Sequence, residues 1–126
     1  MKTVLIVDDE KLIRWSLCRG LLDEFIVHTA DSAEEALNML ARIAVDAVIT
    51  DLCMPGMNGV EFAQRLREIR PGLPVFAITA YSSETAIRDL RSHGVLQIIP
   101  KPFDMEKVRA MLRRHLAGGE PVARSL

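Results

Sequence analysis

Residues 3–11 read TVLIVDDEK, and this stretch decides the fold. Four apolar residues, 4–7, run directly into two adjacent aspartates, Asp8 and Asp9. An apolar run without alternation predicts a strand that is buried on both faces, as in a parallel sheet. Paired like charges at its end indicate either a turn before a helix, where Asp is favoured, or part of a functional site. The rest of the sequence decides between these two interpretations.

Five apolar runs alternate with five helical patterns along the chain. The predicted strands cover residues 3–7, 25–30, 47–50, 74–79 and 96–99. Polar residues that favour helix N-termini precede four of the helical patterns: Ser32, Asn58, Ser82 or Ser83, and Asp104. Gly20, inside the first helical pattern, indicates close approach of that helix to the sheet. The alternation predicts a single doubly wound α/β domain with parallel strand order 2-1-3-4-5.

Composition narrows the class of protein. With 126 residues, 49% apolar and 26% charged, the chain is of ordinary size and composition for one soluble domain. It has no apolar run long enough to span a membrane, and its first residues meet acid too early for a signal peptide, so we expect a cytoplasmic location. The net charge of −1 argues against direct nucleic-acid binding. Cys18 and Cys53 are far apart and predicted to be reduced, and the three histidines lack metal-ligand spacing.

Charged and polar residues follow the predicted strands at one edge of the sheet. Asp8 and Asp9 end the first strand, Asp51 the third and Thr79 the fourth, and Lys101 follows the fifth. In the predicted order the first and third strands are neighbours, so the carboxylates converge. Two such charges 4 Å apart repel by about 4 kcal/mol at an effective dielectric constant near 20. Mg²⁺, which binds carboxylate and phosphate oxygens, relieves this repulsion, and the cluster therefore predicts a phosphate site with a nucleophilic carboxylate.

Residues 2–117 resemble the receiver domain of two-component response regulators. The resemblance rests on four motifs in a fixed order: DD at 8–9, D-x-x-M-P-x-M-x-G at 51–59, TA at 79–80 and KPF at 101–103. Two phrases are more narrowly similar to receivers of the nitrogen-regulation type, IRW at 13–15 and PKPFD at 100–104. The resemblance implies a flavodoxin-like receiver domain at 1–117, followed at 118–126 by a disordered tail or the start of a linker.

The resemblance assigns the central chemistry to Asp51. It implies that this carboxylate accepts a phosphoryl group from a phosphohistidine of a sensor kinase and becomes an aspartyl phosphate. Asp9 and Asp51 would bind Mg²⁺ directly, Asp8 would act largely through a water molecule, and the backbone carbonyl of Cys53 would complete the protein's ligands.

Further roles follow from the same resemblance. Lys101 would pair with one phosphoryl oxygen, and Thr79 would donate a hydrogen bond to another and start the conformational switch. Pro102 would follow a cis peptide bond that turns the lysine toward the site. Many receivers carry an aromatic residue three positions before the lysine, where this sequence has Ile98. An aromatic toggle is therefore in doubt here, and Tyr81 joins Ile98 among the positions expected to tune the switch and the phosphoryl lifetime.

The resemblance also implies partners. These are a sensor histidine kinase or phosphotransfer protein, a homodimer through the surface of the fourth helix, fifth strand and last helix, and a downstream output domain that controls transcription. The chain would be a signalling switch that catalyses only its own phosphorylation and dephosphorylation.

Three alternatives remain open from sequence alone. The first is a Mg²⁺-dependent haloacid-dehalogenase-like phosphatase, although that class has D-x-D after its first strand. The second is a flavodoxin-like flavin binder, although acid stands here in place of its phosphate loop. The third is a receiver-like interaction module that is never phosphorylated.

Overall fold

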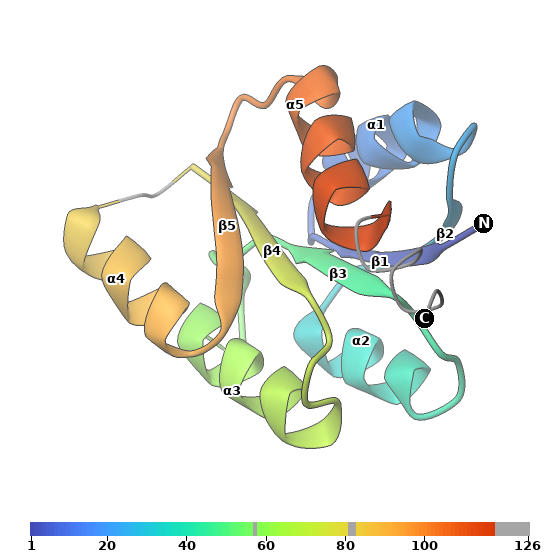
Figure 1. The fold of residues 1–126 in the computed structure, drawn as a ribbon. Coiled ribbons are helices and arrows are strands. Elements are labelled where there is room, and N and C mark those ends of the chain that lie inside the picture. Colours follow the sequence, from blue (N-terminus) through green and yellow to red (C-terminus); the bar gives the residue numbers. More distant parts are fainter. Residues whose placement is uncertain (57, 81–82, 118–126) are drawn as a thin grey trace, which may run out of the picture.

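Five parallel strands form one sheet in the order β2-β1-β3-β4-β5 (Figure 1). The computed structural model describes residues 1–56, 58–80 and 83–117. The strands are β1 (Thr3–Val7), β2 (Ile26–Ala30), β3 (Ala47–Thr50), β4 (Val75–Thr79) and β5 (Val95–Pro100). The helices are α1 (Lys11–Leu21), α2 (Ala33–Leu40), α3 (Gly59–Ile69), α4 (Glu84–Ser92) and α5 (Met105–Leu112). The predicted fold class and strand order are confirmed.

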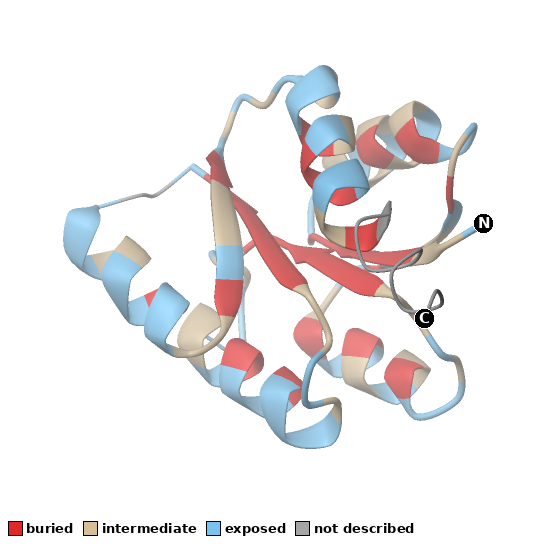
Figure 2. Ribbon diagram, in the orientation of Figure 1, coloured by how far each residue is buried: buried red, intermediate tan, exposed pale blue. Residues whose placement is uncertain are grey.

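Helices cover both faces of the sheet, which explains the unbroken apolar run of β1. Val4 and Ile6 face the side covered by α1 and α5, whereas Leu5 and Val7 face the side covered by α2 and α3. All four are at most 1% exposed, and the central strands are buried along their length in Figure 2. Each such aliphatic side chain contributes about 1.5–3 kcal/mol through burial. These two apolar layers hold the strand ends, and hence the site, in fixed positions.

Four of the helices begin where capping side chains predict. The side chains of Ser32, Asn58, Ser83 and Asp104 accept hydrogen bonds from backbone N–H groups in the first turns of α2, α3, α4 and α5. Each cap satisfies one N–H group that has no partner within its helix. Helix α1 differs, because Glu10 stands at its N-cap position and makes no side-chain capping bond.

One detail of the sequence interpretation, the role of Gly20, is wrong. A Cβ atom on Gly20 would meet the Met105 side chain within 2.4 Å, and Arg109 Nη1 donates to Gly20 O at 2.8 Å, so this glycine allows close approach of α1 to α5 rather than to the sheet. The last helix also changes form after Leu112, and a π-helical turn, η1 (Arg113–Ala117), continues it.

Other expectations fall outside the part of the chain that the structure covers. Tyr81 and residues 118–126 lie outside the described residues, so the domain boundary at 117 and the tuning role of Tyr81 stay predictions. Within the described residues, none of the helices has the length and apolar character needed to cross a bilayer.

Candidate functional site

Strand pairing brings the three aspartates together. Asp51 N donates to Val7 O at 2.9 Å, and Asp8 N donates to Ala30 O at 3.2 Å, so both residues continue the backbone ladder just beyond the strands. Carboxylate oxygens of Asp8, Asp9 and Asp51 all lie within 4.8 Å of one another. The sequence predicted that carboxylates from two neighbouring strands converge at one edge of the sheet, and the structure has this arrangement.

The three carboxylates differ in their exposure to solvent. Asp8 and Asp51 are 2% and 5% exposed, whereas Asp9 is open to solvent. Burial raises the pKa of Asp8, and the negative charge of Asp51 raises it further. A hydrogen bond from Glu10 N at 2.9 Å and the charge of Lys101 oppose this rise without cancelling it. The cluster therefore favours any cation, or a proton, that reduces its negative charge.

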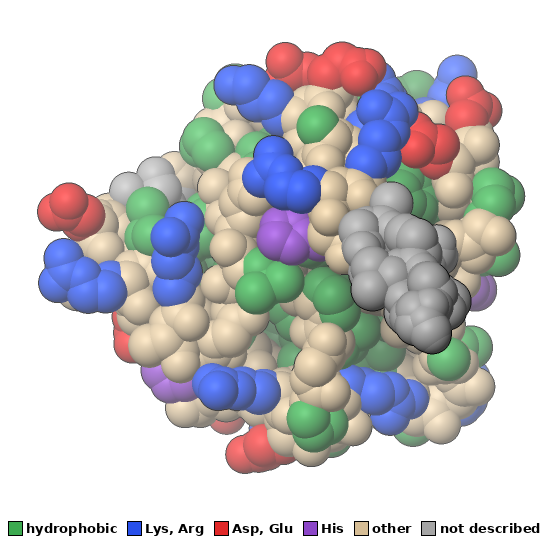
Figure 3. Space-filling view, viewed as in Figure 1, with side chains coloured by type: hydrophobic (Ala, Val, Ile, Leu, Met, Phe, Trp, Pro, Cys, Tyr) green, Lys and Arg blue, Asp and Glu red, His purple; other side chains and the backbone are tan. Residues whose placement is uncertain are grey.

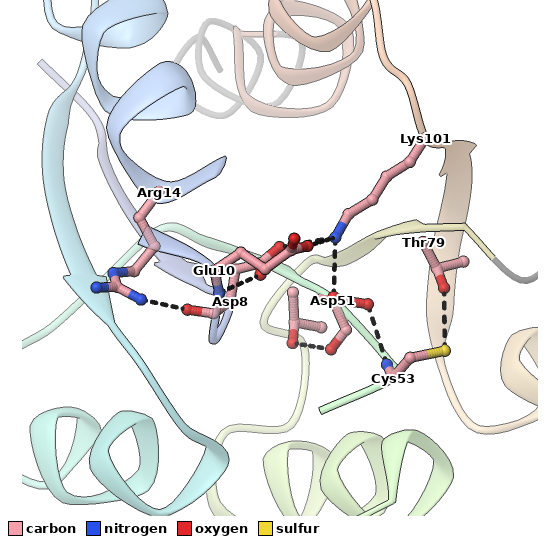
Figure 4. Close-up of polar contacts among 8 residues, drawn as sticks. Asp8, Glu10, Arg14, Asp51, Cys53, Thr79 and Lys101 are labelled. Carbon is pink, nitrogen blue, oxygen red and sulfur yellow. Dashed lines mark hydrogen bonds and ion pairs between the residues drawn. The ribbon is translucent and has the colours of Figure 1, made fainter. Parts of the chain in front are cut away.

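Lys101 supplies one such cation. Its Nζ atom lies 2.9 Å from Asp51 Oδ2, 3.1 Å from Glu10 Oε1 and 3.2 Å from Asp8 Oδ2 (Figure 4). Its backbone N–H donates to Thr79 O at 2.9 Å, and the Lys101–Pro102 peptide bond is cis. Burial by itself lowers the pKa of Lys101, but the hydrogen bonds to Asp51, Glu10 and Asp8 outweigh it and raise that pKa. The ammonium is therefore charged at any physiological pH.

Thr79 and Cys53 border Asp51 on its other side. Cys53 N donates to Asp51 Oδ1 at 3.0 Å, which holds the carboxylate from the loop after β3. The exposed thiol of Cys53 lies 3.5 Å from the buried hydroxyl of Thr79 (Figure 4). The loop then turns at Gly56, where φ is +95°. At Gly59 the start of α3 comes so close to Leu52 that a Cβ atom would lie 2.7 Å from Leu52 Cβ.

A cavity of about 470 Å³ adjoins this side of the site, between the start of α3 and α4. Its lining includes Cys53 and Thr79 together with apolar groups of Leu52, Val60 and Leu90. Ile98, on β5, is partly buried against the same apolar layer. The hydroxyl of Thr79 thus stands between the carboxylates and a space beside α4.

Three residues that sequence reasoning missed also shape the site. Glu10 reaches Lys101, Arg14 Nη1 donates to Asp8 O at 2.8 Å, and Thr50 Oγ1 donates to Asp51 O at 2.8 Å. Of these three residues, only Glu10 could have been found from the sequence, because it directly follows Asp8 and Asp9 and extends the acidic pair to three residues. Arg14 and Thr50 act on backbone carbonyls, which no side-chain motif announces.

The donor set fits a hard divalent cation. The cluster offers carboxylate oxygens from three residues within ligand spacing, and burial together with the negative charge of Asp51 raises the pKa of Asp8. Mg²⁺ prefers one or two carboxylates together with water and phosphate oxygens. Such a cluster can bind a cation and a phosphoryl group together.

Comparison with known proteins gives consistent matches. Residues 4–113 match the response regulator receiver domain family. The chain is 33% identical over 115 residues to the DNA-binding transcriptional regulator NtrC of Escherichia coli strain K12, which covers 90% of this chain and 24% of NtrC. The match agrees with the nitrogen-regulation type of receiver expected from residues 13–15 and 100–104. The chain spans about a quarter of the length of this relative.

Solved structures of receiver-type proteins have the same fold as this chain. The chemotaxis protein CheY4 of Vibrio cholerae superposes with a TM-score of 0.86 at 31% identity, over 90% of this chain and 98% of that one. The BeF3-activated receiver domain of DrrB, a Thermotoga maritima protein, superposes with a TM-score of 0.84 at 27% identity, over 90% of this chain and 96% of that one.

Proposed function

This chain belongs to the response regulator receiver family and is a phosphoacceptor signalling domain, and we propose that Asp51 is the residue that accepts the phosphoryl group. The observation that supports this most directly is the setting of its carboxylate. It lies at the end of β3 beside two further aspartates, with Lys101 2.9 Å from Oδ2 and the Cys53 amide 3.0 Å from Oδ1. No other described carboxylate combines these neighbours.

The proposed transfer is an in-line displacement at phosphorus. An oxygen of Asp51 forms the new P–O bond while the P–N bond to a phosphohistidine breaks, and the imidazole leaves with the electron pair and takes up a proton. Lys101 then donates to one phosphoryl oxygen as a compact point charge, and Thr79 donates to another. The chain's own groups thus position the acceptor and stabilise the transferred charge. We infer that it acts as a switch and catalyses no reaction on other substrates.

Mg²⁺ is the proposed cofactor. Asp9 and Asp51 would bind it directly, Asp8 largely through water, and the carbonyl of Cys53 would complete the protein ligands. Bound there, the ion would supply charge neutralisation to the phosphoryl oxygens. Asp8 and Lys101 would have complementary roles. The negative charge of Asp8 would attract the metal ion, and the positive charge of Lys101 would attract the phosphoryl group.

The proposed switch begins at Thr79. Movement of its hydroxyl toward the phosphoryl group would break the contact with Cys53 and draw the end of β4 toward Asp51, away from the cavity beside α4. Ile98 has no polar ring tip to exchange between water and core, so we propose that the signal passes through the backbone between β4 and α4. The α4–β5–α5 surface would carry it to a second copy or to an output domain.

Partners follow from the family at the coarse level: receivers act with histidine kinases and output domains. We propose that α1 forms the surface for a kinase or phosphotransfer protein. This helix begins at the site, and its Leu12 and Trp15 are 77% and 56% exposed. The guanidinium of Arg19 lies over the Trp15 ring, 4.9 Å from its centroid.

We propose that the output is transcriptional and the location cytoplasmic, since the relatives include a DNA-binding transcriptional regulator. We propose that the domain itself does not contact nucleic acid. The net charge is −1, and on the face in Figure 3 the Lys and Arg side chains lie scattered among acidic ones.

Incubation with acetyl phosphate and Mg²⁺, followed by intact mass, tests the acceptor. We expect a mass gain of one phosphoryl group, with borohydride trapping and peptide mapping locating it at residue 51. Asp51→Asn should not label. Asp23→Asn changes an exposed aspartate before the start of β2, away from the carboxyl ends of the strands, and should label as the wild type does. Failure of the wild type to label with any donor would favour the receiver-like module that is never phosphorylated. Family membership sets aside the dehalogenase-like and flavin-binding alternatives.

A further inference from the structure

Three carboxylates surround the Lys101 ammonium. Its N–H groups donate hydrogen bonds to Asp51 at 2.9 Å and to Glu10 at 3.1 Å, and it forms an ion pair with Asp8 at 3.2 Å. A phosphoryl oxygen that arrives at Asp51 therefore competes with these carboxylates for the ammonium. Lys101 pairs with it more fully once one of the three contacts is released.

The three contacts differ in how easily they can be released. The side chains of Asp8 and Asp51 are 3% and 5% exposed, whereas that of Glu10 is 60% exposed. A buried carboxylate that loses its partner stays out of water, at high cost. Glu10 can rotate into solvent and be hydrated, and exposed ion pairs contribute little to stability. Glu10 is therefore the contact that exchanges most readily.

The local structure holds Glu10 in place for this contact. Its backbone N–H donates to Asp8 Oδ1 at 2.9 Å, and its carbonyl accepts from Ile13 N and Arg14 N at 3.1 Å. It occupies the N-cap position of α1, where Ser, Thr, Asp or Asn is preferred, yet its side chain makes no capping bond. Instead the carboxylate reaches a lysine 91 positions along the chain. Departures from a local rule of this kind concentrate at functional sites.

We propose that Glu10 is an internal competitor for Lys101 that restrains phosphorylation of Asp51. Its carboxylate occupies the donor of Lys101 that a phosphoryl oxygen uses after transfer. The oxygens of Glu10 and Asp51 both lie about 3 Å from the same nitrogen, so they are at most about 6 Å apart. At that range the negative charge of Glu10 also opposes the approach of an anionic donor. This inference rests on the proposed function of Asp51 and assigns that site a further positioning residue.

The Glu10→Gln variant tests the proposal, because it removes the charge and keeps the length of the side chain. With acetyl phosphate and Mg²⁺ at low ionic strength, we expect the initial labelling rate to rise about threefold to tenfold. The rise should shrink as potassium chloride is raised from about 20 mM to about 500 mM, because salt screens charge repulsion. Glu68→Gln, an exposed glutamate in the last turns of α3, is the matched control and should label at the wild-type rate at both salt concentrations.

An equal or lower rate for Glu10→Gln at low salt would overturn the proposal, as would a gain that persists unchanged at high salt. The latter would indicate a loosened structure rather than lost charge. A second measurement needs no transfer: calorimetric titration with Mg²⁺ and beryllium trifluoride, the anion used to activate the DrrB receiver. We expect Glu10→Gln to bind it several-fold more tightly than the wild type, and equal affinity would contradict the competition. Because this comparison stands apart from labelling, it separates failure here from failure of the phosphoacceptor assignment.

Discussion

Replacing Lys101 with methionine is the most direct test of the site's electrostatics. Methionine keeps the length and the apolar stem but removes the ammonium that lies 2.9 Å from Asp51 and 3.2 Å from Asp8. Breaking a buried ion pair by removing one partner costs about 3–5 kcal/mol. Lys101 keeps some solvent access and Glu10 can relax into water, so we expect the free energy of unfolding to fall by about 2–4 kcal/mol at pH 8 without Mg²⁺.

The loss should depend on pH through Asp8. Burial already raises the pKa of Asp8, and Lys101 partly offsets that rise. Without Lys101 the pKa of Asp8 rises further, so the folded variant binds a proton more readily than its unfolded chain does. Its stability therefore increases as pH falls through that raised pKa. The pKa of Lys101 is itself raised, so the lysine is charged in the folded and unfolded states between pH 5 and 8 and adds no pH dependence there.

Urea unfolding followed by far-ultraviolet circular dichroism provides the measurement. The difference between wild type and Lys101→Met should be largest at pH 8, smaller at pH 5, and reduced at pH 8 by about 10 mM Mg²⁺ through ligand linkage. Lys107→Met, the same change at an exposed lysine of α5, should alter the free energy of unfolding by less than about 0.5 kcal/mol. A loss below about 1 kcal/mol at pH 8, or one that is the same at pH 5, would refute the reasoning that Lys101 compensates buried carboxylates.

Three further predictions concern the metal and the loop that holds Asp51. Addition of Mg²⁺ at about ten times its dissociation constant should stabilise the free protein by about 1.4 kcal/mol, and Asp9→Asn should remove most of the rise in melting temperature; an equal rise would count against the ligand set. Gly59→Ala should destabilise by about 1–3 kcal/mol in thermal unfolding, because the added Cβ would lie 2.9 Å from Leu52 O as well as against its side chain; a neutral effect would show that this loop yields. Asn58→Ala should cost about 1 kcal/mol in urea unfolding by removing the cap of α3, and Asn58→Asp should keep that stability.

The sequence by itself determined the elements of the fold. Apolar runs without alternation, separated by amphipathic helices, indicate a parallel sheet covered on both faces. Among the common doubly wound orders, 2-1-3-4-5 suits five strands, and the structure has this order. Capping residues such as Asn58 and Asp104 marked helix starts because their effect is local. The convergence of Asp8 and Asp51 was also predictable, since residues that end neighbouring parallel strands must meet at the same edge.

Only the tertiary structure decided which charges pair and which surfaces meet. That Lys101 shares its ammonium among Asp8, Glu10 and Asp51 depends on side-chain reach between residues up to 93 positions apart. The contact of Gly20 with Met105 likewise depends on how α1 lies against α5, and the sequence pattern pointed to the sheet instead. The spacing of apolar residues indicates which side of a helix or strand is buried, because that spacing depends only on the local geometry of the element. It does not indicate which other element packs against that side, because the distances between residues remote in sequence are set only when the sheet and its helices are packed.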